Sequence, residues 1–238
     1  MAINKIKQGR WNRQIHLAKA GVRAGFGWAS DQITTMVLPS DKRELARSHL
    51  MQKQAEDWVQ QLGQLKGSIV KIGQILATYA DYCLPAPLAI ALHQLEAETE
   101  PLSWSAISVH INESLQGRQR ELIIEPVSLA AASLSQVHTA RIKKDNHVIC
   151  LKILYPGITK TLDSDLAVLE QGLRWWLHND EQQRFSLWIA AIHEVMLEEL
   201  DVQLEAIKIK RWIIRLKDDM RFVVPVVSEG YCSQNILA

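Results

Sequence analysis

The sequence has little net charge, few cysteines and no long apolar run. Its 27 basic and 26 acidic residues leave a formal net charge of +1, which argues against a general nucleic-acid binder. The three cysteines, Cys83, Cys150 and Cys232, lack CxxC spacing, so neither a disulfide framework nor a zinc site is expected. No apolar run approaches the roughly 20 residues of a membrane span. With 47% hydrophobic residues in 238, a cytoplasmic globular protein is expected.

Residues 1–40 differ from the rest of the chain in their charge. Before the first acid, Asp31, stand six basic residues interleaved with apolar and aromatic ones: Lys5, Lys7, Arg10, Arg13, Lys19 and Arg23. These basic residues interrupt any secretory leader. The pattern is typical of a helix on a membrane surface and of a transit peptide, and a solvated helix packed on the domain would share it. Peripheral contact with the inner membrane surface is therefore one expectation.

The first half of the chain is expected to be helical. Apolar residues recur every three or four positions over 43–80, and the prolines that follow end this helix. Further helices are predicted over 87–97 and after 101–104.

The pattern changes near residue 121. Strands are predicted over 122–124, 136–142 and 147–154, with a turn at Lys144-Asp145-Asn146. Helices are predicted over 161–178 and 186–216, followed by strands over 221–227 and 231–238. This order predicts an α+β fold with an antiparallel sheet.

Lys152 lies inside the apolar stretch 148–154, on the same side of the predicted strand as Val148 and Cys150. An unpaired buried ammonium group is costly. The lysine is therefore either a solvent-exposed residue of an edge strand, where it would deter aggregation, or it meets a partner.

The predicted helix 186–216 carries four carboxylates on one stripe: Glu194, Glu198, Asp201 and Glu205. Like charges at this spacing repel one another. The stripe is either a solvated acidic face or a surface that meets cations, a lysine or a metal ion. Glu199 and Asp201 face roughly opposite sides of a regular helix, so both reach one site only if the helix begins or distorts there.

Three alanines stand where a turn residue such as glycine would be expected, in the segment Ala130-Ala131-Ala132-Ser133. Helix propensity alone would begin a helix over 129–135. However, a strand, a turn, a strand lysine and a helix glutamate, in this order, are typical of a protein-kinase small lobe. There the turn covers the nucleotide phosphates and the lysine pairs with the glutamate.

Four segments together resemble the UbiB family of atypical kinases, the ADCK-type proteins linked to ubiquinone metabolism. In the family's order they are KGSIVKIGQILATYADYCLP, LAAASLSQVHTARI, VICLKILYPGI and EELDVQLEA. The resemblance covers residues 60–238 and implies a helical KxGQ-type extension over 41–118. It also implies a kinase-like small lobe with inserted helices over 119–238, truncated in the fifth strand.

The resemblance also implies the roles of particular residues. The nucleotide, ATP with Mg²⁺, would be bound by Ala130, Ala131, Ala132, Ser133, Lys152 and Glu205. The regulatory KxGQ and ExD motifs would be Lys71, Gly73 and Gln74, and Glu199 and Asp201. By itself, a glycine within a helix indicates only close packing or a break.

The large lobe, with its catalytic loop and metal-binding motif, is expected to be absent, so no catalytic or metal-binding residue is assigned. Three explanations remain: a fragment of a longer enzyme, a chain that pairs with a separate large lobe, or a non-catalytic relic. The expected function is the N-terminal part of an ATP-binding UbiB-like kinase or ATPase that supports ubiquinone biosynthesis and is not catalytic alone. The alternative is a non-catalytic helical module that binds a membrane surface or a partner. A quinone-pathway lipid or protein is an expected partner, and nucleic acid is not.

Overall fold

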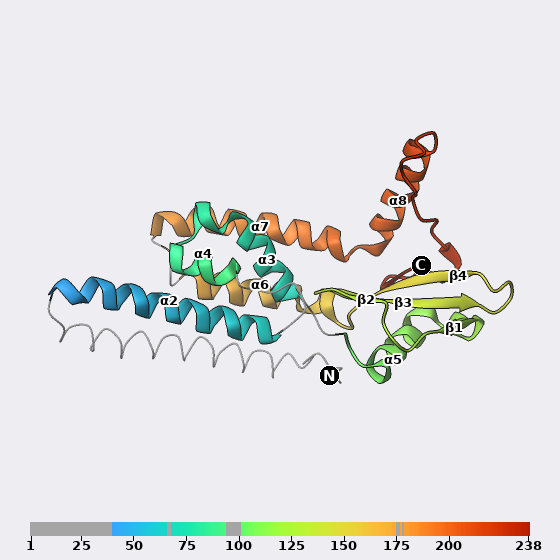
Figure 1. Ribbon diagram of the computed structural model, residues 1–238, viewed down its shortest axis with the longest axis horizontal. Helices are drawn as coiled ribbons and strands as arrows, with labels where there is room; N and C mark the ends of the chain where they lie inside the picture. Colours follow the sequence, from blue (N-terminus) through green and yellow to red (C-terminus); the bar gives the residue numbers. More distant parts are fainter. Residues whose placement is uncertain (1–39, 66–67, 94–100, 175–176, 178) are drawn as a thin grey trace. The chain divides into compact units, whose positions relative to one another are not determined.

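The computed structural model describes residues 40–65, 68–93, 101–174, 177 and 179–238 (Figure 1). The basic residues before Asp31 lie outside this part of the chain, so the predictions made for them stay predictions. The chain divides into two compact units, each built from separate stretches of the chain. In described residues, the sheet unit comprises 101–159 and 194–238, and the helical unit comprises 40–65, 68–93, 160–174, 177 and 179–193.

The sheet unit contains five antiparallel strands in the order β1-β3-β4-β5, with β2 also paired to β3. The strands are β1 (Leu122–Ile124), β2 (Ala130–Ala131), β3 (Ser135–Ile142), β4 (Val148–Leu154) and β5 (Ile236–Leu237). The helices of this unit are α5 (Trp104–Leu115), the end of α7 (Asn179–Leu200) and α8 (Val202–Leu216), with short 3-10 turns η1 (Arg118–Glu121) and η2 (Glu229–Tyr231). The mixed helix and antiparallel-sheet fold is as predicted from the sequence.

The two faces of the sheet differ in burial because side chains alternate along each strand. On β4, Ile149, Leu151 and Ile153 are at most 7% exposed, whereas Val148 and Cys150 are exposed. Helix α5 packs on the buried face with Ile107, Ile111 and Leu115, which recur every four residues. The side chains of Val148, Cys150 and Lys152 therefore belong to the other face, which α5 does not cover.

Two predicted elements are wrong, and the strand predicted over 231–238 is limited to β5. The single helix predicted over 186–216 is two helices, α7 and α8, separated at Asp201. The strand predicted over 221–227 does not form: this stretch has no strand partner, and Pro225 lacks the N–H that a ladder needs. High β propensity does not make a strand unless the segment pairs with another strand, and on this side of β4 the pairing is made by β5, at Lys152 and Ile153.

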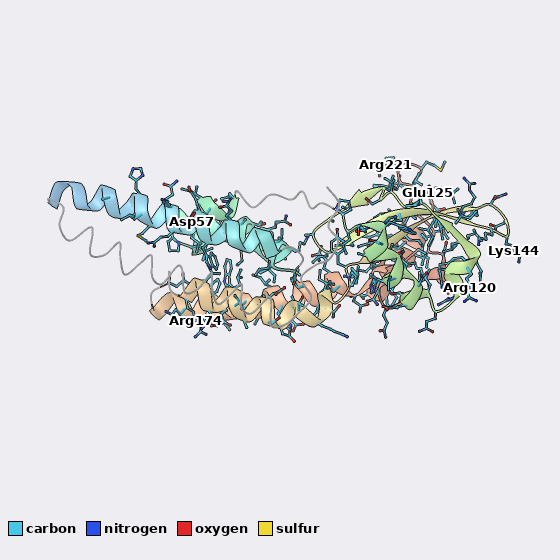
Figure 2. All side chains as sticks on the ribbon, turned by 90° about the horizontal axis from the view of Figure 1, so that it is seen from below. Asp57, Arg120, Glu125, Lys144, Arg174 and Arg221 are labelled. Carbon is cyan, nitrogen blue, oxygen red and sulfur yellow. The ribbon has the colours of Figure 1, made fainter. Side chains whose placement is uncertain are left out.

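The helical unit packs α2 (Ser40–Leu65), α3 (Ser68–Cys83) and α4 (Ala86–His93) with α6 (Ile158–Arg174) and the first part of α7. Gly172 of α6 lies against the Trp58 ring of α2, and Ser68 of α3 donates a buried hydrogen bond to Asp165 of α6. Arg174, labelled in Figure 2, donates to Ser186 Oγ of α7 at 3.3 Å.

The compact units group the helices differently from the predicted division at residue 118. Helix α5 belongs with the sheet, whereas most of α6 and α7 belongs with α2–α4. None of the helices in the described ranges has the length and hydropathy of a membrane-spanning helix.

Candidate functional site

Lys152 and Glu205 form an ion pair on the sheet face that α5 does not cover. Lys152 Nζ donates to Glu205 Oε1 at 2.8 Å and to Oε2 at 2.6 Å. The two side chains are 32% and 35% exposed. A pair this open to solvent contributes only about 0.2–1 kcal/mol to stability. The ion pair therefore contributes little to stability. The third hydrogen of the Lys152 ammonium group can still donate to an anion.

Lys152 is held by strands on both sides. It lies directly opposite Val137 on β3 and Leu237 on β5. It is therefore not a residue of an edge strand, and the first of the two interpretations made from the sequence is wrong. The carboxylate of Glu205 instead compensates its charge.

The Ala-rich segment forms a tight turn rather than the start of a helix. Ala130 and Ala131 pair with Val137 and Gln136, and the Ala132 N–H donates to Ser135 C=O at 2.8 Å. No residue of this turn has a positive φ, so the turn does not require glycine. The C=O of Leu134, within the turn, accepts the Tyr155 N–H at 2.9 Å and so links the turn to the end of β4.

The register of the strands places the Ala-rich strand and the ion pair on one face. Ala130 lies opposite Val137, which lies opposite Lys152, and residues directly opposite one another point to the same side of a sheet. At about 4.8 Å between neighbouring strands, Ala130 and Lys152 are about 10 Å apart across the sheet. The buried Ser133, 7% exposed, lies in the turn beyond this row.

The ExD residues occupy the junction between two helices. Glu199 lies in the last turn of α7, and Asp201 is the N-cap of α8. The Asp201 carboxylate accepts the Gln203 N–H at 3.0 Å and the Leu204 N–H at 2.9 Å. Glu199 and Asp201 could reach one site only if the helix began or distorted there, and the break between α7 and α8 provides this change.

The acidic stripe is divided by the same break and meets lysines. Glu194 and Glu198 lie on α7, and Glu205 lies on α8. Lys208 Nζ contacts Glu198 Oε2 at 2.9 Å, and Glu205 binds Lys152. Within the described ranges, no group of three His, Cys, Asp or Glu side chains is arranged to hold a metal ion.

Lys71, Gly73 and Gln74 lie on α3, in the helical unit. Gly73 is buried, whereas the side chains of Lys71 and Gln74 are partly exposed. Their expected role, in which Lys71 and Gln74 cover the place where a protein substrate would otherwise bind, stays a prediction.

Two buried polar residues beneath the turn were not singled out from the sequence. Gln136 Oε1 accepts the Leu102 N–H at 2.9 Å, and Gln136 Nε2 lies 2.7 Å from His138 Nε2. His138 Nδ1 lies 2.7 Å from the C=O of Glu125, a residue labelled in Figure 2. Because the Gln136 amide can donate to Nε2 and the carbonyl can only accept, this arrangement suits a neutral imidazole protonated on Nδ1. The sequence feature that could have indicated this network is the pair Gln136 and His138, two polar residues on the same, buried side of strand β3.

Comparison with known proteins gives three kinds of match. A family model described as "ABC1 atypical kinase-like domain" matches residues 94–238. A "Probable protein kinase UbiB" of Cellvibrio japonicus (strain Ueda107) is 30% identical over 200 residues, 81% of this chain and 34% of the relative. A protein of the same description from Blochmanniella pennsylvanica (strain BPEN) is 27% identical over 175 residues, 71% of this chain and 32% of the relative.

The chain thus spans about a third of the length of these curated relatives. Among solved structures, "The complex structure of Rv3197-erythromycin from Mycobacterium tuberculosis" is 26% identical with a TM-score of 0.46. That alignment covers 82% of this chain and 50% of the other.

Proposed function

The chain belongs to the UbiB/ADCK-type family of ABC1 atypical kinase-like domains, and from this premise we propose that it supplies the small-lobe half of an ATP-binding site. The whole protein would be an atypical kinase or ATPase that supports ubiquinone biosynthesis, and residues 1–238 would not be catalytic alone. The observation that carries the proposal is that Lys152 and the Ala-rich strand lie on one face of the sheet, where Glu205 of α8 binds Lys152.

The chemistry of this face suits a nucleotide triphosphate. The Lys152 ammonium is a compact cation that can donate to phosphate oxygens while Glu205 keeps it oriented. Val137 and Ala130 add an apolar surface beside it. Because Ala130 to Ser133 form a hairpin without positive φ, their backbone is more restricted than a glycine-rich loop would be.

The described residues fit ATP better than they fit Mg²⁺. The Lys152 amine can bind phosphate, but Glu205 is occupied by Lys152, and no metal-ligand cluster is present within the described ranges. We therefore assign no residue of this chain to Mg²⁺. The ion would arrive with the phosphates and find its protein ligands elsewhere in the whole site.

The test is the affinity of residues 1–238 for a fluorescent ATP analogue with Mg²⁺, measured for wild type and Lys152→Ala. Loss of a charge-assisted hydrogen bond, about 1.5–3 kcal/mol, should weaken binding by about 10–150-fold. Lys208→Ala is the matched control, because it removes the same charge from another ion pair of α8. Equal affinities of wild type and Lys152→Ala would refute the proposal.

A parallel measurement addresses catalysis. Wild-type residues 1–238 should show no ATP hydrolysis above the background rate. Robust turnover that is lost in Lys152→Ala would show that the chain needs no further lobe.

A membrane-surface or partner-binding role is the second candidate. It is favoured by α8, in which Ile207, Trp212 and Ile214 are 45–73% exposed on the same helix as the exposed Arg211 and Arg215. Exposed aromatic and basic residues on one helix are typical of an interfacial segment. Co-sedimentation with anionic liposomes tests this role, using wild type, a variant lacking residues 1–30, and Trp212→Ala. Wild-type binding lost only in the truncated variant would assign the contact to the N-terminal segment, and no binding by wild type would exclude the role.

A further inference from the structure

The position of Glu205 depends on where α8 begins. The buried residues of α8 are Val202 and Ala206, both near its N-terminus, and its second half has none. Gln203 Nε2 also donates to Ser233 C=O at 2.6 Å. The buried contacts of α8 with the rest of the sheet unit are thus made by its first turns, which carry Glu205, whereas Lys210 farther along forms an exposed ion pair with Glu229.

The sequence around the junction gives little reason for a break. The segment EELDVQLEA contains neither proline nor glycine, and its periodicity predicts one continuous helix over 186–216. In a continuous helix Glu205 would lie on one stripe with Glu194 and Glu198, as the sequence spacing predicts. The feature that favours the break is therefore local to Asp201.

Asp201 makes the interactions of an N-cap. Its backbone, with φ −89° and ψ 87°, is outside the helical region. Its carboxylate accepts two N–H groups of the first turn, and its C=O accepts the Glu205 N–H at 3.0 Å. Glu205 is therefore one hydrogen-bonded turn from the cap, so fixing the cap also fixes the glutamate.

We propose that Asp201 is a positioning residue, whose N-cap maintains the break between α7 and α8 and so holds Glu205 against Lys152. The inference rests on the proposed function in one respect, namely that the oriented Lys152 side chain binds phosphate. It assigns Asp201 a role through hydrogen bonding at the cap rather than through its charge. An acidic residue that acted as a ligand would require the charge itself.

The experiment separates these roles with two substitutions in residues 1–238. Asp201→Asn removes the charge and keeps a good N-cap, whereas Asp201→Ala removes both. The first readout is the acylation rate of the Lys152 amine, measured by peptide mass spectrometry without nucleotide. Glu205→Gln serves as the unpaired reference. The second readout is affinity for the fluorescent ATP analogue.

Asp201→Ala should raise the acylation rate of Lys152 about fivefold, because this factor corresponds to the stability lost with a typical N-cap. Nucleotide binding should weaken by a similar factor. Asp201→Asn should stay within about twofold of wild type in both readouts, since asparagine caps as well as aspartate. Ser103→Ala is the matched control, because Ser103 is the N-cap of α5 but makes no side-chain cap bond. It should leave Lys152 acylation unchanged.

Either of two results would overturn the proposal: Asp201→Asn as damaging as Asp201→Ala, or Asp201→Ala indistinguishable from wild type. If Asp201→Ala does not fold, Asp201→Asn still tests the proposal. A role that required the charge of Asp201 would raise Lys152 acylation and weaken nucleotide binding in this variant. If wild type binds no nucleotide, the proposed function fails, whereas the acylation readout still tests the positioning role.

Discussion

Gly172→Ala should destabilise the protein although it improves helix propensity. A Cβ at position 172 of α6 would lie 2.6 Å from Trp58 Cζ2, 3.0 Å from Cε2 and 3.1 Å from Nε1. The Trp58 side chain is 6% exposed, so its rigid ring has little room to move. Overpacking of this kind costs about 1–3 kcal/mol, and alanine regains about 1 kcal/mol of helix propensity. A net loss of about 1 kcal/mol is expected.

The assay is urea unfolding of residues 1–238, followed by far-UV circular dichroism, with an unchanged slope as the condition for comparing midpoints. In a Trp58→Leu background the ring atoms are gone, so Gly172→Ala should become stabilising by about 1 kcal/mol. Gly230→Ala is the control, since a Cβ there meets no atom within 4 Å.

The double-mutant cycle isolates the contact between the two positions, and contacting pairs couple by about 0.5–3 kcal/mol. A stabilising Gly172→Ala in the wild-type chain would refute the predicted contact. The same cost in both backgrounds would also refute it, because the Trp58 ring would not be the cause.

Three further predictions concern buried polar groups of the sheet unit. Tyr155→Phe should be neutral or stabilise by up to about 1 kcal/mol in urea unfolding, because the buried Tyr155 hydroxyl has no hydrogen-bond partner and burial raises the pKa of Tyr155 to about 12; a loss above about 1 kcal/mol would contradict this. Gln136→Leu should cost about 1–3 kcal/mol, because it leaves the Leu102 N–H without its acceptor, and unchanged stability would show that the bond is dispensable. Burial lowers the pKa of His110 below its ordinary 6.5, against the raising effects of Glu113 and a backbone hydrogen bond. The unfolded chain then binds the proton more readily, so stability should fall as pH drops below about 6.5, and His110→Leu should flatten that part of the profile; parallel profiles for the two proteins would contradict the assignment.

Local chemistry explains why the central hairpin could be predicted. The alternation of β3 and β4 comes from residues adjacent in the chain, and the turn between them needs only its own residues. The Asp145 carboxylate accepts the His147 N–H at 3.0 Å, and Asn146 adopts φ 61°, a conformation that asparagine tolerates. Strands β3 and β4 begin and end within one residue of the predicted strands 136–142 and 147–154.

Elements that depend on distant partners were predicted less well. Residues 221–227 have the composition of a strand but pair with no other strand. The helix break at Asp201 depends on hydrogen bonds from the Gln203 and Leu204 N–H groups to the Asp201 carboxylate. The periodicity of apolar residues does not indicate such a cap. The Gln136–His138 network likewise requires the Leu102 and Glu125 backbones, from other segments.

The sequence by itself determined the α+β class, the strand that carries Lys152 and, through the resemblance, the family. It also placed Glu205 on a helix, 53 positions away. Only the tertiary structure decided that the two side chains meet, that α8 starts at Asp201, and that α6 packs on Trp58 with the early helices. The physical reason is that periodicity identifies which face of an element is buried, whereas the surface that covers this face comes from elsewhere in the chain.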